Sequence, residues 1–268
     1  MLELRDIDFE KISRLVYDQC GIHLHDGKRE LVKARLGKRL REGNFKSFGE
    51  YYQHVTTVDG TDELILMIDS ISTNLTYFFR EESHFKKLSR LVPQFAGERK
   101  SLRMWSAGCS TGEEAYSLAI VAKEALGISS MDFSIVATDI STRVLKAAAS
   151  GIYSEEKINR IPADLLKKYF QYGTGRSAGF YKVREEIRKA IEFRRFNLMQ
   201  PIPADFRFQI IFCRNVMIYF DKKTQNDLIN RFYDSLHKGG YLFVGHSESL
   251  TGLSHGFDYI EPSIYRKS

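Results

Sequence analysis

The sequence predicts an α/β fold in which a small all-helical region precedes an open sheet of parallel strands with helices on both faces. About the first 70 residues show helical periodicity and no strand pattern. From residue 101 onward, short apolar runs alternate with segments of helical periodicity, an order that is typical of a parallel sheet. Residues 168–196 interrupt this alternation and predict a small antiparallel insertion.

Four helical segments are expected in the first region. Gly21 and Gly43 follow the first two, where a glycine commonly ends a helix. Ser47 is placed to cap the third helix, and Glu50 stands three residues further on, as in a capping box. The fourth segment is interpreted as a helix or a linking stretch. The four segments cover residues 7–20, 27–42, 47–55 and 64–71.

Strands and helices alternate in the second region. The run at 208–213 is almost continuously apolar, as expected for a central strand that is buried on both faces. Gly127 and Gly151 follow two of the helices, and Gly239 and Gly240 follow the last one. The predicted strands cover residues 102–108, 133–138, 208–213 and 241–245, and the predicted helices cover residues 113–126, 142–150 and 222–237.

The insertion is predicted from short aromatic runs that are separated by turn residues. Gly173 and Gly175 fall in the turn between its first two strands, and Gly179 begins the second strand. Its two or three strands are expected at 169–172, 179–183 and 191–193. The chain is therefore divided into a helical domain at 1–62, a linker at 63–73 and an α/β domain at 74–268 with the insertion at 168–196.

The composition indicates a globular protein, since 43% of its residues are hydrophobic. No apolar run is long enough to span a bilayer and the N-terminus has no signal-peptide pattern, so we expect a cytoplasmic protein without membrane insertion. Cys20, Cys109 and Cys213 are dispersed, which argues against a disulfide framework or a structural metal site. The net charge of +6 favours an acidic partner.

A glycine turn follows the first predicted strand and opens a helix. It contains Gly108 and Gly112 but not the three glycines of dinucleotide-binding proteins. Glu113 and Glu114 begin the helix, and they would repel a pyrophosphate at its N-terminus. They suit a ligand without phosphate that carries positive charge, such as S-adenosylmethionine. The alternative is that the two glutamates only complement the helix dipole.

Polar residues also end two predicted strands. Asp139 ends the second strand, where an acid commonly accepts hydrogen bonds from ribose hydroxyls; the alternative is a cap of the following helix. Arg214 and Asn215 follow the buried run at 208–213, and Tyr219 lies just beyond them. Open α/β sheets bind ligands at the carboxyl ends of their strands, so a ligand site is favoured here.

Positive charge collects on the second predicted helix. Arg35 and Arg39 are one turn apart and share a face with Lys28, while Arg41 follows close by. A run of charge is usually a solvated face, but acids are few in this helix. An acidic binding partner is therefore a reasonable expectation.

Five segments in this order resemble the CheR family of chemotaxis receptor methyltransferases, and the resemblance covers nearly the whole chain. It rests on Asn-Leu-Thr-Tyr-Phe-Phe-Arg at 74–80, Trp-Ser-Ala-Gly-Cys-Ser-Thr-Gly-Glu-Glu at 105–114, Ala-Thr-Asp-Ile at 137–140, Phe-Cys-Arg-Asn-Val-Met-Ile-Tyr-Phe at 212–220 and Gly-His-Ser-Glu-Ser at 245–249.

The resemblance implies a Rossmann-like methyltransferase domain that uses S-adenosyl-L-methionine and releases S-adenosyl-L-homocysteine. It implies methylation of glutamate side chains on methyl-accepting chemotaxis receptors, with recruitment to membrane receptor arrays. Arg80 and Tyr219 match positions near the transferred methyl group, and Arg35, Arg39 and Arg41 match the surface that meets the receptor's acidic helices. The implied cofactor contacts are Asn74, Thr76, Arg80, Gly108, Glu114, Asp139, Asn197, Leu198, Arg214 and Asn215.

Some points stay open in the sequence. Either Glu113 or Glu114 could make the acidic contact, and we expect Glu114. The loop with Gly173, Gly175 and Gly179 resembles the longer form that docks on a C-terminal receptor pentapeptide. A nucleic-acid methyltransferase is the first alternative, but no RNA-binding module is found and no nucleic-acid partner is expected. A non-catalytic module that binds S-adenosylmethionine is the second.

Overall fold

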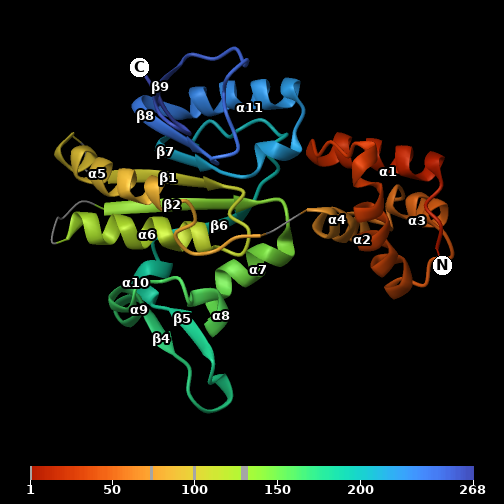
Figure 1. The fold of residues 1–268 in the computed structure, drawn as a ribbon, viewed down its shortest axis with the longest axis horizontal. Coiled ribbons are helices and arrows are strands. Elements are labelled where there is room, and N and C mark those ends of the chain that lie inside the picture. The colour runs from red at the N-terminus through yellow and green to blue at the C-terminus, as the bar shows by residue number, and fades with distance from the viewer. Residues whose placement is uncertain (1, 73–74, 99–100, 128–131) are drawn as a thin grey trace.

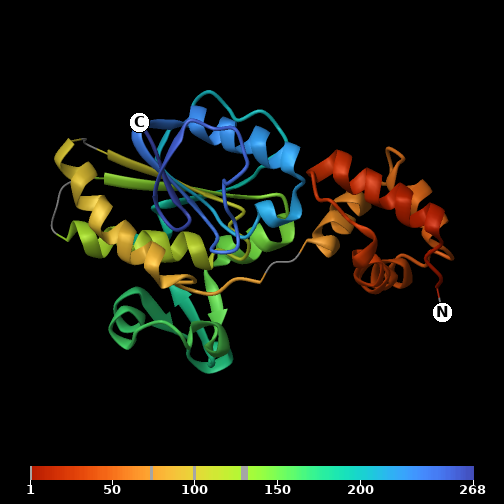
Figure 2. The same cartoon turned by 45° about the horizontal axis from the view of Figure 1, so that its top comes forward.

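The computed structural model describes residues 2–72, 75–98, 101–127 and 132–268. The helical region forms a bundle to one side of the sheet (Figures 1 and 2). Gly21 adopts a left-handed conformation that ends the first helix, and the Ser47 hydroxyl caps the third helix by accepting from the Glu50 N–H, as predicted. The elements are α1 (Asp6–Cys20), η1 (Asp26–Lys28), α2 (Arg29–Glu42), α3 (Phe48–Val55) and α4 (Thr61–Ile71).

The predicted linker at 63–73 largely forms α4. Met67, Ile68 and Ile71 on this helix are buried in the same hydrophobic core as α1, α2 and α3. We therefore propose that the helical domain extends to about residue 71.

The second region contains a seven-stranded sheet in the order β6-β2-β1-β7-β8-β10-β9. The first five strands of this order are parallel, and β10 pairs with β8 and β9 in antiparallel fashion. The strand order reverses between β1 and β7, which is where open α/β sheets bind ligands. The strands are β1 (Ser101–Ala107), β2 (Asp132–Asp139), β6 (Ile191–Arg195), β7 (Phe208–Cys213), β8 (Leu236–Val244), β9 (Phe257–Glu261) and β10 (Ile264–Lys267).

Helices cover both faces of this sheet, so the predicted α/β class is confirmed (Figure 1). Side chains alternate along the strands: Met104 packs in the core beneath α5 and α6, whereas Trp105 packs in the core beneath α11. The Trp105 indole N–H donates to the Thr138 hydroxyl (2.9 Å) and ties β1 to β2. The helices are α5 (Glu82–Glu98), α6 (Glu113–Leu126), α7 (Thr142–Ser150) and α11 (Lys222–Ser235).

The insertion differs from its prediction in one strand. Its sheet has the order β3-β5-β4, and the strand at 191–193 instead pairs with β2 in the large sheet as β6. The third strand of the small sheet, β3, lies before the predicted insertion. Strand pairing joins segments far apart in the chain, so local alternation could not assign these strands. The elements are β3 (Ile152–Ser154), α8 (Glu155–Ile158), α9 (Ala163–Tyr169), β4 (Phe170–Tyr172), η2 (Gly175–Ser177), β5 (Phe180–Val183) and α10 (Glu185–Arg188).

We call residues 152–190 the inserted subdomain. It lies against the layer of helices that includes α6, on the side away from the large sheet (Figures 1 and 2). The predicted helix at 222–237 is two residues too long, because β8 already begins at Leu236 and contains Gly239 and Gly240. In the part of the chain that the structure describes, every helix is too short or too polar to cross a bilayer.

Candidate functional site

A pocket opens at the carboxyl ends of β1, β2 and β7, and it contains about 960 Å³ of empty space including the solvent at its mouth. Ten of the predicted site residues line it, although they come from five separate segments of the chain. These are Thr76, Arg80, Gly108, Glu114, Asp139, Asn197, Leu198, Arg214, Asn215 and Tyr219. The remaining predicted contact, Asn74, lies outside the described residues.

The glycine turn forms one wall of the pocket. Gly108 has a φ of +88°, and a Cβ atom there would come within 2.4 Å of the Val216 side chain. Its N–H and that of Cys109 both donate to the Thr138 carbonyl (2.8 and 2.9 Å), which fixes the turn against β2. Glycine is therefore required at this position for close packing.

Only one of the two glutamates that follow the turn faces the pocket. Glu114 lines it, accepts a hydrogen bond from the Ser106 hydroxyl (2.7 Å), and has a pKa that is raised by burial. Glu113 is fully buried and pairs with Lys157 (2.7 Å) and the Thr111 hydroxyl (2.6 Å). The geometry therefore favours Glu114 as the ligand-facing acid.

Asp139 is not the cap of the next helix. Ser141 caps α7 by accepting from the Val144 N–H, whereas the Asp139 carboxylate accepts from the backbone N–H groups of Ser110 (2.9 Å) and Ser141 (3.0 Å). The carboxylate lines the pocket, and its burial raises its pKa. Its remaining lone pairs can accept hydrogen bonds from a ligand.

Arg214 forms the centre of a buried charge cluster. Its guanidinium contacts Glu81 (3.0 Å) and Glu114 (3.3 Å), and it also donates to the Arg80 carbonyl. The Arg214 side chain is only 2% exposed, so these contacts take place away from bulk water. Burial would raise the pKa of Glu81, but Arg214 and the His246 N–H outweigh burial and lower it.

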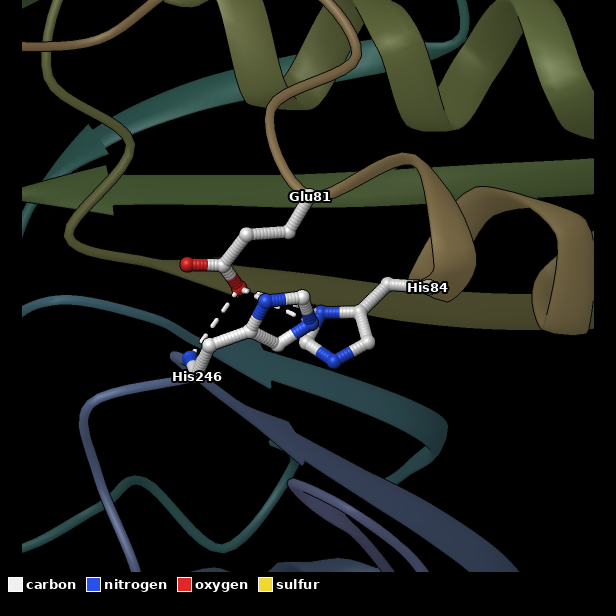
Figure 3. A group of neighbouring side chains, drawn as sticks. All are labelled: Glu81, His84 and His246. Carbon is white, nitrogen blue, oxygen red and sulfur yellow. Dashed lines mark hydrogen bonds and ion pairs between the residues drawn. The ribbon is translucent and has the colours of Figure 1, made fainter.

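Glu81, a member of this cluster, also lies close to His84 and His246 (Figure 3). Their possible ligand atoms are within 4.8 Å of one another, a spacing that could suit a metal ion. However, the Glu81 oxygen that faces both histidines also bonds to Arg214 and to the His246 N–H (3.2 Å). A guanidinium so close to this oxygen opposes a divalent cation. We interpret the group as a network that fixes Glu81 and, through it, Arg214.

The substitution His84→Phe is expected to flatten the pH dependence of stability in mild acid. Burial, followed by the charge of Arg214, lowers the pKa of His84 from 6.5 to about 3. Unfolding therefore takes up a proton between these two pH values, so the free energy of unfolding falls as the pH drops below 6.5. Phenylalanine keeps a ring against Phe212 and Phe243 and has no titrating nitrogen.

Urea denaturation at about pH 7 and pH 5.5 measures this effect: over this interval the free energy of unfolding should fall about 1.3 kcal/mol more in the wild type than in the variant. An equal fall in the free energy of unfolding in both proteins would contradict a lowered pKa for His84. His84→Gln serves as a second variant that removes the titration but keeps polarity.

Four non-glycine residues around the pocket have positive φ angles: Phe79 (55°), Glu81 (60°), Ser110 (49°) and Asn215 (58°). Such conformations are strained, and they persist only where the surroundings determine them. Glu248 supplies one such constraint, since its carboxylate accepts from the N–H groups of Asn215 (2.8 Å) and Ile218 (3.2 Å). The strained backbone conformations thus lie in the loops that carry the polar residues of the pocket.

The helical domain forms another wall of the pocket, a feature that the sequence did not predict. Cys20 and Ile22 line the pocket. The Asn197 side chain donates to the Gln19 carbonyl (2.6 Å), and the His23 N–H donates to the Tyr219 carbonyl (2.8 Å). The end of α1 therefore holds two of the predicted site residues in place.

The other predicted residues lie away from the pocket. Arg35 donates to the carbonyls of Ile71 (2.5 Å) and Ser72 (3.1 Å) at the end of α4, and Arg39 pairs with Glu63 (2.6 Å) and Glu42 (2.6 Å). Arg41 is exposed. Two of the three arginines thus hold the bundle together, which a charge pattern alone could not reveal.

Gly175 begins η2 in the turn between β4 and β5, and Gly173 and Gly179 lie on either side of η2. Gly175 and Gly179 have positive φ angles of 59° and 84°. The Gly173 N–H donates to the Phe180 carbonyl (2.8 Å) and closes the hairpin. Strand β4 is an edge strand of its sheet.

Two family models cover most of the chain. The model described as "CheR methyltransferase, SAM binding domain" matches residues 74–265, and "CheR methyltransferase, all-alpha domain" matches residues 7–72. The chain is 40% identical to a chemotaxis protein methyltransferase of Borreliella burgdorferi (97% of this chain and 94% of that protein). It is 42% identical to chemotaxis protein methyltransferase 2 of Pseudomonas aeruginosa (96% and 92%) and 40% identical to a chemotaxis protein methyltransferase of Escherichia coli (100% and 93%).

Proposed function

The chain belongs to the CheR methyltransferase family, and on this premise we propose that it transfers a methyl group from S-adenosylmethionine to glutamate side chains of bacterial chemoreceptors. The product is a glutamate methyl ester that adjusts receptor signalling. The named relatives support the chemotactic role, and the charges in the pocket support the cofactor and the acceptor.

The observation that carries this proposal is the charge balance of the pocket. Arg80 and Arg214 line the pocket with two positive charges, and Glu114 and Asp139 line it with two negative charges when ionised. Glu81 lies outside the lining but pairs with Arg214, and counting its carboxylate leaves a net charge of −1 around the pocket. S-adenosylmethionine has a net charge of +1, with a sulfonium, an ammonium and a carboxylate. Opposite charges attract strongly where water is excluded, so the pocket fits this ligand.

We assign each cofactor contact by its position. Asp139 would accept from the ribose hydroxyls at the end of β2, and Asn197 and Leu198 would line the adenine on the side of α1. Glu114 would face the positively charged amino-acid end together with Thr76, and Arg214 would hold Glu114 in place. Gly108 would allow the ligand to approach the turn.

The remaining task of the site is to position the reacting groups. S-adenosylmethionine supplies an electrophilic methyl group on a sulfur that leaves readily. A glutamate carboxylate with an ordinary pKa of about 4.3 is already ionised at neutral pH, so the site needs no general base. We propose that Arg80 steers this carboxylate and that Tyr219 orients the reacting groups by hydrogen bonding. Correct orientation alone can contribute on the order of 7–11 kcal/mol.

The receptor would reach the pocket along two further surfaces. Arg41 remains exposed on α2 and could meet an acidic receptor helix, whereas Arg35 and Arg39 would support that surface from within the bundle. The edge strand β4, with the turn around Gly173, Gly175 and Gly179, could add a C-terminal receptor pentapeptide as an extra strand. Such docking would recruit the protein to membrane receptor arrays and raise its local concentration there.

Transfer of a labelled methyl group to receptor-containing membranes tests the proposal. We expect label that alkali releases as methanol, because methyl esters hydrolyse in base, and mass spectrometry should place it on glutamates. A catalytically inactive binding module would transfer no label. A nucleic-acid methyltransferase would label RNA or DNA in parallel reactions, and either of these results would refute the proposed function.

A further inference from the structure

Tyr77 links the inserted subdomain to the loop that carries Arg80. The Arg160 guanidinium lies 4.3 Å from the centre of the Tyr77 ring, and the Arg80 guanidinium lies 5.8 Å from the same centre. The Arg160 distance is the shortest between a cation and an aromatic ring among the described residues. Tyr77 lines the pocket, and Tyr77 and Arg160 both line an adjoining groove along α5 and α6.

The backbone on both sides of Arg160 is fixed. Ile158 and Ile161 are buried in the core shared with α5 and α6, and the Ile161 N–H donates to the Ile158 carbonyl (2.9 Å). Arg160 itself is exposed and pairs with no carboxylate in the described parts of the chain. Its position over Tyr77 therefore comes from the fold of the subdomain and from the attraction of a cation to a ring face.

The loop next to Tyr77 is also held by the subdomain. Phe78 packs edge-on against Tyr153 (4.9 Å) and Phe170 (5.5 Å), which lie on β3 and β4. Phe79 and Glu81 on either side of Arg80 adopt positive φ angles, so the loop conformation depends on its surroundings. A shift of the subdomain would thus be transmitted to the segment that presents Arg80.

We propose that Arg160 is a positioning residue for methyl transfer: it holds the Tyr77 ring, and through that ring it orients Arg80 toward the acceptor carboxylate. The inserted subdomain then has a role inside the reaction in addition to any role as a docking site. This inference rests on the proposed function, since it concerns the same pocket and the same acceptor.

Steady-state methyl transfer to a receptor fragment that lacks the C-terminal peptide tests the inference without peptide docking. Arg160→Gln should lower kcat about five- to tenfold, with the S-adenosylhomocysteine dissociation constant and the melting temperature unchanged. Arg160→Lys should recover most of the loss, because an ammonium also binds a ring face. Arg184→Gln is the matched control, since Arg184 is an exposed arginine on the same subdomain.

A double-mutant cycle separates this coupling from two independent effects. Tyr77→Leu should lower kcat by a similar factor, and the double variant Arg160→Gln/Tyr77→Leu should be no slower than Tyr77→Leu alone. The inference would be overturned if the kcat losses of the two single variants multiplied in the double variant. It would also be overturned if the kcat of Arg160→Gln stayed within about twofold of the wild type. Inactivity of the wild type would instead refute the proposed function itself.

Discussion

Arg80→Ala is expected to lower kcat by about 100- to 1,000-fold while changing the S-adenosylhomocysteine dissociation constant less than about tenfold. The Arg80 guanidinium lines the pocket, donates to the Leu75 carbonyl (2.9 Å), and pairs with no carboxylate in the described segments. Its charge is therefore free to attract an anionic acceptor. The loss should appear in turnover because the acceptor carboxylate would no longer be held in line with the methyl group.

Initial rates at saturating S-adenosylmethionine, together with titration calorimetry, measure the two quantities. Arg90→Ala is the matched control, since Arg90 is exposed on α5 and does not line the pocket. Near-normal rates in Arg80→Ala would show that the acceptor is positioned by other groups. The kcat of Arg80→Lys should lie between those of the wild type and Arg80→Ala, because lysine keeps the positive charge but lacks the planar set of N–H donors of a guanidinium.

Asp139→Ala is expected to weaken binding of S-adenosylhomocysteine about 100-fold, through the loss of two charge-assisted hydrogen bonds to the ribose. The carboxylate is buried and ends β2 inside the pocket, with both oxygens also accepting from backbone N–H groups. Asp139→Asn keeps one acceptor oxygen and should show a smaller loss. Titration calorimetry gives the dissociation constants directly.

Asp132→Ala provides the control at the other end of the same strand, where the side chain is exposed. An unchanged dissociation constant in both Asp139 variants would show that Asp139 only braces the turns at Ser110 and Ser141. Melting temperatures of the variants distinguish a local loss of binding from a loosened fold.

Local signals in the sequence predicted much of this fold. Glycines that follow a helix marked the ends of α1, α6 and α7, and the apolar run at 208–213 marked the central strand β7. Residues 82–98 received no prediction, yet they form α5, which continues through Pro93. Its buried apolar residues recur at helical spacing, and their packing in the core outweighs the cost of the proline inside the helix.

In the site, too, residues with a local sequence signal could be predicted, whereas contacts between distant segments could not. Residues at strand ends, such as Asp139 and Arg214, could be found because parallel strands bring their carboxyl ends together. Contacts that join distant segments around the site could not be predicted: Tyr17 on α1 donates to Asp221 (2.7 Å), and Glu81 contacts both Arg214 and His246. No spacing rule predicts such pairs, because they depend on how whole domains pack.

The central claim is that one pocket, at the carboxyl ends of β1, β2 and β7, holds the methyl donor. Titration of the purified full-length protein with S-adenosylhomocysteine in a calorimeter tests it most directly. We expect saturable binding with one site per chain that Asp139→Ala weakens and Asp132→Ala leaves unchanged. Absence of binding in the wild type, or equal binding in all three proteins, would contradict the claim.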